Sequence, residues 1–485
     1  MERIHMNRRR LSVAAFSFLF AYLLSFLFEG QVLYGLLDAA SVDAAPYVLA
    51  AIIAHFFGLF CCGFLCRSPR GAKTAVLAGM AVCLAVSPVF FRPPSSLWLG
   101  ALAVAGFSAG CAVAAWGCFL REYTPKNRRL KSCADMLIYS NLIMTAVNMA
   151  TARLSPRLGL ALSILCLLTG LALTCLLPGG GRPFRSAAEP KKAASLRRPM
   201  GVLFLFVAVI TVDSGLMYQV INPAFEHLTD LVSWYWAVPY IAALVFMRNF
   251  PVSTTARRSR FLYVGMGMIM AAFLAFMLLQ RSAADYLVVD TLMLGACGIF
   301  DLFWWSIIGE TLDYGENPVS VFGVGLSANV FGVLLGDVIG VSVRAVRLPE
   351  AQVAVIALCV VCVTLMILPP LNRQLTLLLK THAYLSAYST LPEQTQARVA
   401  AAIAPLDPLT EREADILRLL LEGLGNREIA AAGFIKDGDV YAINTLITNG
   451  DHLTEATEVI TAISGTPDPA LFALPKDFAE YKPIG

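Results

Sequence analysis

The stretch LSVAAFSFLFAYLLSFLF, residues 11–28, contains no charged residue. A helix needs about 20 predominantly apolar residues to cross the hydrocarbon core of a bilayer, so this stretch is long enough to span it. Arg8, Arg9 and Arg10 precede it, as basic residues do in a secretory signal peptide. The apolar stretch is longer than the usual core of a signal peptide, and we therefore expect it to be the first membrane span.

Eleven more apolar stretches follow between short polar or basic breaks, with centres near residues 56, 83, 109, 145, 168, 211, 240, 270, 297, 330 and 361. The chain is 58% apolar and 14% charged, whereas soluble domains are about 45–50% apolar and about 25% charged. This excludes a secreted disulfide scaffold, a nucleic-acid-coating protein and a disordered chain. We expect an all-α polytopic membrane protein with twelve transmembrane helices. The weakest are the fifth, which Asn141 and Asn148 interrupt, and the eighth, which is short.

The basic residues favour one orientation of these spans. With a cytoplasmic N-terminus, the inward segments carry 22 Lys and Arg and the outward loops carry six. Basic residues collect on the cytoplasmic side of membrane proteins, so both termini are expected in the cytoplasm. One inward loop, residues 309–318, breaks the pattern because it has no basic residue and three acids: Glu310, Asp313 and Glu316.

Four acids lie in or near the predicted spans of the second half: Asp213, Asp290, Asp301 and Asp337. Ionisable groups in a membrane are costly and are functional candidates by default. Asp290 and Asp301 are about three helical turns apart and share a helix face with Trp305. Such an acidic and aromatic wall can receive a cationic or amphipathic small molecule, so we take all five residues as candidate ligand-binding residues. Alternatively, the carboxylates pair with neighbouring helices or lie near the interfaces.

Other patterns in the membrane part have structural explanations. Ala328, Gly332, Gly336 and Gly340 recur every four residues in the eleventh span, which is typical of close helix packing. The twelve cysteines lie mostly in apolar runs, where a free Cys behaves as a small hydrophobic residue. We find no phosphate loop, nucleophile–base pair or metal-ligand cluster with the required spacing. We therefore expect no enzymatic activity, catalytic residue, metal or cofactor.

Twelve spans, cytoplasmic ends and a long basic central loop at residues 179–199 resemble the major facilitator superfamily. The resemblance implies two six-helix bundles, residues 1–178 and 200–370, around a central cavity near the membrane midplane. The superfamily's signature between spans two and three is half present in this chain. Gly63, Arg67, Arg70 and Lys73 are retained, but the acid of the signature is missing, which counts against coupled transport.

A different pattern follows the membrane part, in the stretch LTEREADILRLLLEGLGNREIA, residues 409–430. Thr410 and Glu413 form a capping box that starts a helix, Gly423 ends this helix, and Asn426 can cap a second one. Two short helices joined by a glycine-containing turn predict a helix-turn-helix. The stretch resembles the first half of a LuxR-type DNA-binding domain, in which a third helix enters the major groove of DNA.

The LuxR resemblance implies that Arg412, Asn426 and Arg427 contact DNA phosphates and that residues 436–443, including Lys436 and Tyr441, read the bases. Arg412 could instead pair with an acid on its own helix, and Asn426 could serve only as a cap. From residue 430 onward the chain has three Lys, no Arg and eight acids. Because cations supply much of the affinity for DNA, we expect weak binding. Apolar residues recur at helical spacing in residues 440–447 and 453–463 and predict further helices.

These observations divide the chain into a membrane domain at residues 1–370, a linker at 371–406, a LuxR-type domain at 407–465 and an irregular tail at 466–485. Residues 1–370 have a net charge of +10 and residues 371–485 a net charge of −6. The two resemblances together imply a membrane-bound one-component regulator in the bacterial plasma membrane. Its expected partners are DNA, an unidentified small molecule and the lipid bilayer.

Two alternatives to the regulator remain open. The first is a secondary transporter of the major facilitator type whose tail is vestigial or regulatory. The second is a scaffold whose acidic tail binds a basic protein. Three explanations fit the acidic tail: an altered partner, a decayed DNA reader, or a change at the 3′ end of the gene.

Overall fold

The computed structural model describes residues 2–28, 30–178, 197–249, 255–313, 317–346, 348–389, 419, 440–449 and 452–462. The chain divides into two compact units: the first consists of Met1–Glu189 and Leu196–Thr376, and the second of Pro190–Ser195 and Leu377–Gly485. Within the first unit, the described residues are helices and short connections, as the hydropathy pattern predicts.

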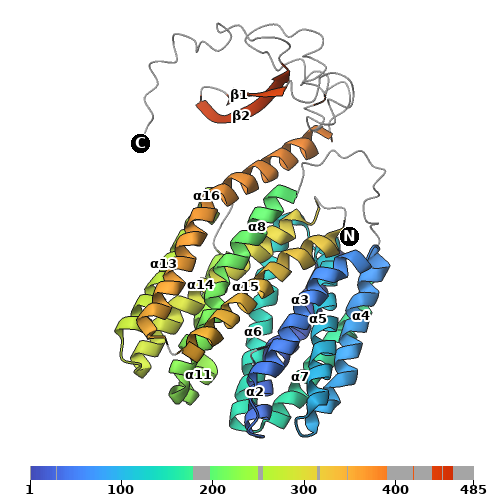
Figure 1. The fold of residues 1–485 in the computed structure, drawn as a ribbon. Helices are drawn as coiled ribbons and strands as arrows, with labels where there is room; N and C mark the ends of the chain where they lie inside the picture. Colours follow the sequence, from blue (N-terminus) through green and yellow to red (C-terminus); the bar gives the residue numbers. More distant parts are fainter. Residues whose placement is uncertain are drawn as a thin grey trace. The chain divides into compact units, whose positions relative to one another are not determined.

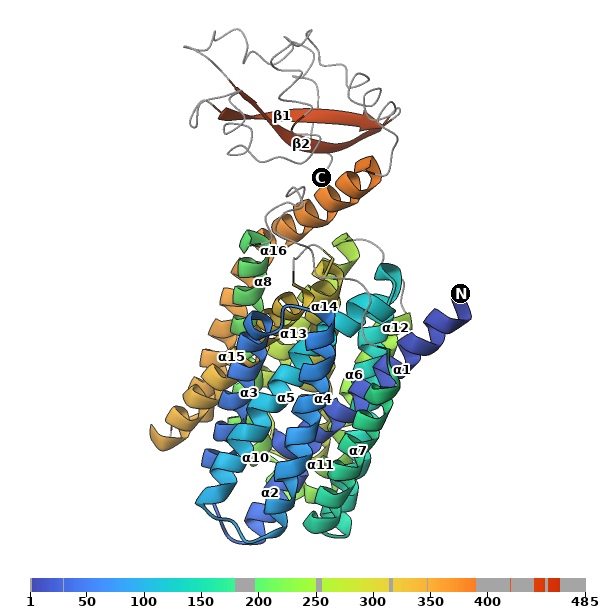
Figure 2. The same ribbon diagram turned by 90° about the vertical axis from the view of Figure 1, so that its right-hand side faces the viewer.

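The first half of the membrane unit is drawn in blue to teal in Figure 1. Its long helices run roughly side by side in Figures 1 and 2. Its elements are α1 (Glu2–Tyr22), the π-helix η1 (Leu23–Leu27), α2 (Gln31–Asp38), α3 (Ala45–Leu65), α4 (Pro69–Val86), η2 (Ser87–Phe91), α5 (Ser96–Tyr123), η3 (Lys126–Arg128), α6 (Arg129–Arg153) and α7 (Pro156–Leu176).

The second half is drawn in green to orange beside the first half in Figure 1. Its elements are α8 (Arg197–Ile210), α9 (Val212–Leu216), the π-helix η4 (Met217–Ile221), α10 (Asn222–Ala224), η5 (Glu226–Leu228), α11 (Thr229–Tyr235), α12 (Ala237–Asn249), α13 (Thr255–Leu278), α14 (Ala283–Thr311), α15 (Pro318–Val346) and α16 (Glu350–Ser389).

Among the described residues, ten helices are long and apolar enough to cross a membrane. They coincide with ten of the twelve predicted spans. The other two predictions fall on α6, which carries polar residues along its 25 residues, and on α12, an apolar helix of 13 residues. These are the two spans that the sequence predicts least strongly, so the number twelve stays a prediction.

Side-chain caps define where several of these helices begin. The hydroxyls of Ser68, Ser155 and Ser282 accept hydrogen bonds from backbone N–H groups in the first turn of α4, α7 and α14. A proline follows the first two serines, and this residue fits the first helical turn because its missing N–H would have no partner there. Asp285 completes a capping box at Ser282.

The first span of each half is interrupted by a π-helix, η1 in one half and η4 in the other. In both spans the π-helix follows a regular α-helix and precedes a short α-helix. Such π-helical turns are rare and often mark functional segments. The shared position indicates that η1 and η4 are equivalent irregularities of the two halves.

Glycines set the distance between neighbouring helices. A Cβ added at Gly106 of α5 would lie 2.3 Å from the Ala51 carbonyl oxygen of α3, so the two backbones touch. The glycine stripe of α15 acts in the same way, because a Cβ at Gly332 or Gly336 would lie 2.2 Å from a backbone oxygen of the seventh span. The predicted packing role of this stripe is confirmed.

The second unit corrects one sequence prediction. Residues Val440–Asn449 and His452–Ala462 form the antiparallel strands β1 and β2, not helices. Their register pairs Val440 with Ala462 and has an irregularity between Ile447 and Thr448. These segments are rich in β-branched residues, and an Asn-Gly pair, a common signal of a tight hairpin turn, begins at Asn449, the last residue of β1. Helical periodicity alone was therefore misleading.

Replacing Gly106 with Leu should destabilise the membrane unit, because its side chain would meet the α3 backbone. Overpacking of a core costs about 1–3 kcal/mol, and thermal unfolding of the full chain in detergent measures the change. Gly100→Leu on the same helix is the matched control, since an added Cβ there meets nothing within 4 Å. Equal unfolding midpoints for the two variants would contradict the packing.

Candidate functional site

Three of the predicted ligand-binding acids lie near one another in the second half. Asp301 on α14 accepts a hydrogen bond of 2.5 Å from the hydroxyl of Tyr240 on α12. The thiol of Cys297, one turn earlier on α14, interacts electrostatically with Asp301, with Asp290 on the same helix and with Asp213 on α9. On α14, Asp290 lies about two turns before Cys297 and Asp301 about one turn after it, and Asp213 lies on α9.

Two of these acids have unsatisfied oxygen atoms. The side chain of Asp213 is 1% exposed, and neither of its carboxylate oxygens has a hydrogen-bond partner among the described residues. One oxygen of Asp290 is also buried without a partner in this part of the chain. Buried polar groups without partners are costly and rare. Asp213 lies on α9, one turn before the irregular segment η4, so this location combines an unsatisfied carboxylate with an irregular helix.

Asp337 and Trp305 have other surroundings. Asp337 on α15 accepts a hydrogen bond of 3.3 Å from Gln219 of η4, and Arg344 donates to the same glutamine. Trp305 packs against aromatic rings of the first half, with its ring centroid 5.5 Å from that of Phe20. It is buried in the contact between the halves and does not face the carboxylates around Cys297.

The aromatic contact between the halves is dense. Phe16 and Trp116 stack with their ring centroids 4.1 Å apart, and Phe322 of α15 lies 5.7 Å from Trp116 and 5.4 Å from Trp305. All four side chains are buried. This cluster fills the space between α1 and α5 of the first half and α14 and α15 of the second.

A buried arginine also joins the halves. Arg129, the first residue of α6, is only 3% exposed and binds Asp313 after α14 through two contacts of 2.8 and 3.0 Å. It also donates to the carbonyl oxygens of Gly309 at 2.9 Å and of Thr124 at 3.3 Å. The acidic loop at residues 309–318 thus has a partner in the basic segment of the first half.

A second ion pair lies further along α6. Arg248 of α12 donates to the Asp135 carboxylate at 2.5 Å, and Arg9 of α1 lies 3.7 Å from the other oxygen of Asp135. The sequence analysis missed this pair. The available signal was a lone acid in a predicted span that follows a strongly basic segment, but nothing local indicated its partners.

The incomplete signature after α3 is contacted by a residue from the second half of the membrane unit. The Asn317 side-chain amide donates to the carbonyl oxygens of Gly63 and Cys66 at 2.7 and 2.8 Å. These carbonyls at the end of a helix have no partner within it, so Asn317 satisfies them. Gly63 is required because a Cβ there would lie 2.3 Å from the Ser320 Cα.

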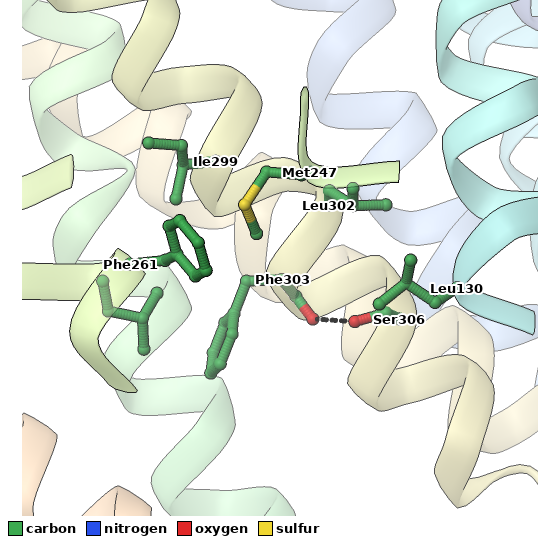
Figure 3. Close-up of a pocket in the computed structure, with 8 residues that line it drawn as sticks. Leu130, Met247, Phe261, Ile299, Leu302, Phe303 and Ser306 are labelled. Carbon is green, nitrogen blue, oxygen red and sulfur yellow. Dashed lines mark hydrogen bonds between the residues drawn. The ribbon is translucent and has the colours of Figure 1, made fainter. Parts of the chain in front are cut away.

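A small pocket lies between α6, α12, α13 and α14, and its lining is apolar apart from Ser306 (Figure 3). The hydroxyl of Ser306 donates to the Phe303 carbonyl oxygen at 2.8 Å and is therefore satisfied within α14. The volume of the pocket is about 10 Å³. This is room for at most about one water molecule, so the pocket does not admit a ligand in this arrangement of the helices.

The predicted DNA-contacting residues are mostly outside the described residues, namely Arg412, Asn426, Arg427 and Lys436. Tyr441 is described and lies in strand β1, opposite Thr461. It is therefore not on a third helix. The predicted role of Tyr441 as a base reader on such a helix needs correction, because its segment pairs as a strand.

Comparison with known proteins finds similarities for both parts of the chain. Residues 407–442 match the family of bacterial regulatory proteins of the luxR type. The human organic anion transporter MFSD10 superposes with a TM-score of 0.56 and 17% identity over 75% of this chain and 99% of that chain.

Two further solved structures have a similar fold. The Escherichia coli fucose:proton symporter gives a TM-score of 0.55 at 13% identity, and a bacterial homologue of the iron transporter ferroportin gives 0.54 at 15%; each covers 76% of this chain and 99% of its own. A comparison with curated protein sequences finds no significant match. Identities this low show the fold alone.

The Arg129–Asp313 pair should be energetically coupled. Asp313→Asn should lower the unfolding free energy of the wild-type chain but have less effect when Arg129 is already replaced by Gln. We expect a coupling energy of about 0.5–3 kcal/mol from the double-mutant cycle, measured by chemical unfolding in micelles. Lys131→Gln, an exposed cation on the same helix, is the control. Additive effects would show that the pair contributes nothing to stability.

The chain joins a membrane unit that has the fold of solved transporters to a segment, residues 407–442, that matches the family of bacterial regulatory proteins of the luxR type.

Proposed function

We propose that the protein is a membrane-bound transcription regulator whose membrane domain senses a small molecule and whose cytoplasmic domain binds DNA. The observation that carries this proposal is the luxR-family match at residues 407–442, in the same chain as a membrane unit that ends at Thr376. A DNA-binding domain that is fixed to a membrane domain can report the conformation of the membrane domain to DNA. A transporter does not need a DNA-binding domain.

The two halves of the membrane unit support the sensing role. They are joined at Arg129–Asp313 and at Asp135–Arg248, and such polar contacts can be made in one packing and lost in another. A ligand shifts such an equilibrium only when it binds one packing better than the other. The carboxylates around Cys297, with the unsatisfied Asp213, are the candidate ligand site, because a cationic group there would supply the missing partner.

The last helix of the membrane unit provides a connection to the DNA-binding domain. Helix α16 runs from Glu350 to Ser389 and includes Pro369 and Pro370, while the boundary of the first unit lies at Thr376. The helix therefore starts in the membrane unit and ends in the second unit. A change in the packing of its membrane-spanning part can then reach the segment that precedes the luxR-type domain.

The orientation is part of the same proposal. The 22 inward and six outward basic residues favour cytoplasmic termini in the plasma membrane of a bacterium. This orientation puts residues 407–442 on the side where DNA is located. It also puts the Arg129 and Asp135 ion pairs on that side, since both lie in the first turns of α6, after the basic segment.

The full-length chain in lipid nanodiscs should bind DNA from its own upstream region, as fluorescence anisotropy would show. With about three phosphate contacts, the affinity should fall roughly tenfold to a hundredfold between low and physiological salt. Arg427→Ala should reduce the salt slope by about one. Lys482→Ala, which removes a cation outside the luxR match, should leave the slope unchanged. Absence of binding even at low salt would contradict the regulator.

The second candidate function is secondary transport, which the similarity to solved transporters favours. In proteoliposomes we expect no substrate-dependent flux across a broad panel of cationic and amphipathic compounds. Flux that is lost in Asp301→Asn, but retained in the helix-capping variant Asp285→Asn, would instead establish a transporter. Both positions lie on α14, so comparing the two variants distinguishes loss of the Asp301 carboxylate from a general disturbance of the helix.

A further inference from the structure

An apolar groove of about 330 Å³ lies between α12, α13 and α14. Its lining includes Ala242 and Phe246 of α12, Val264 and Met268 of α13, and Gly295 and Ile299 of α14. The groove is separate from the carboxylates around Cys297, although α14 contributes to both.

The groove opens on the surface of the membrane unit that faces lipid. Phe246 is 54% exposed and Val264 is 55% exposed, and their exposed neighbours Val238, Val245 and Val288 are apolar as well. An apolar surface of this kind on a membrane-spanning helix is in contact with hydrocarbon chains. Along α12 the lining runs from Pro239 to Phe246, about 10 Å of helix. This is most of one leaflet of a hydrocarbon core of about 30 Å.

Arginines lie beyond one end of the groove. Phe246 and Phe261 contact each other edge to face at this end, with ring centroids 6.1 Å apart. Arg248 follows two residues after Phe246, and the exposed Arg260 directly precedes Phe261. The sequence adds Arg257 and Arg258, and residues 237–278 contain no acid. Arg248 is paired with Asp135 of α6, so the exposed Arg260 is the described cation that can meet a headgroup at this end of the groove.

We propose that this groove is a binding site for an anionic phospholipid of the surrounding bilayer. One acyl chain lies in the groove against Ala242, Val264 and Gly295, and the phosphate lies at the level of Arg260. The apolar lining selects a hydrocarbon chain, and Arg260 selects an anionic headgroup over a zwitterionic one. The inference holds for a regulator and for a transporter alike, because it depends only on the membrane surface.

A lipid bound in this groove would also affect the contact between the two halves. Helix α12 forms one wall of the groove and carries Arg248, which binds Asp135 on α6. A bound acyl chain packs against this helix and supports it in the position where the ion pair forms. Anionic lipid is therefore expected to stabilise the described packing of the two halves.

Native mass spectrometry of the full-length protein tests the proposal. The purified chain is incubated with equal amounts of phosphatidylglycerol and phosphatidylcholine, and the lipids that stay bound are counted. The wild type should retain one phosphatidylglycerol in preference to phosphatidylcholine. Arg260→Gln should lower this preference roughly fivefold, and Ala242→Leu, which fills the groove from its exposed side, should lower retention of both lipids.

Matched controls come from α4, in the other half. Arg70→Gln removes an exposed arginine and Ala78→Leu enlarges an exposed lipid-facing alanine, and neither should change lipid retention. All four positions are exposed, so the variants should elute as folded protein in size-exclusion chromatography. Equal binding of the two lipids by the wild type, or unchanged phosphatidylglycerol binding in both groove variants, would overturn the proposal.

Discussion

No water is available in the core of a bilayer, so each polar group that is buried there needs a partner within the protein. Several buried polar groups of the membrane unit follow this constraint. Arg129 is buried at the start of α6 and binds the Asp313 carboxylate and two carbonyl oxygens. Asp135 lies between two arginines, and Asp301 accepts from Tyr240. Asp213 is the conspicuous departure, and it lies beside the irregular segment η4. A buried carboxylate without a partner is a candidate binding residue, because a bound ligand can supply the missing hydrogen bond or charge.

Much of the membrane fold could be predicted from the sequence, because long apolar runs and basic breaks are local signals. The glycine stripe of α15 could also be predicted, since small residues at four-residue spacing are typical of close helix packing. The candidate site was predicted in part. Spacing on α14 put Asp290 and Asp301 on one face, but it also put Trp305 there, and this ring packs toward the first half. The partners of Asp135 could not be predicted, because α1 and α12 are distant in sequence and only the folded bundle brings them to α6.

After the membrane unit, the luxR pattern could be recognised from the sequence, but the structure of the residues that follow it could not be predicted from the pattern. The luxR pattern at residues 409–430 was recognisable because nearly every position carries the expected residue, and the family match confirms it. Beyond residue 430, apolar spacing was compatible with helices and with strands. The β-branched residues and the Asn-Gly pair favour a hairpin, which is the observed pairing of β1 and β2. A LuxR-type domain with this hairpin in place of its usual last helices would require another way to form dimers or to contact DNA.

A regulator must occupy DNA in the cell while it is fixed in the membrane. Chromatin immunoprecipitation of the tagged full-length chain, beside an Arg129→Gln variant, measures this occupancy directly. We expect enrichment of a small number of discrete DNA sites by the wild type, and a changed level of enrichment at the same sites when the contact between the halves is weakened. Enrichment no greater than that of a variant truncated before residue 407 would contradict a regulatory function and would favour transport.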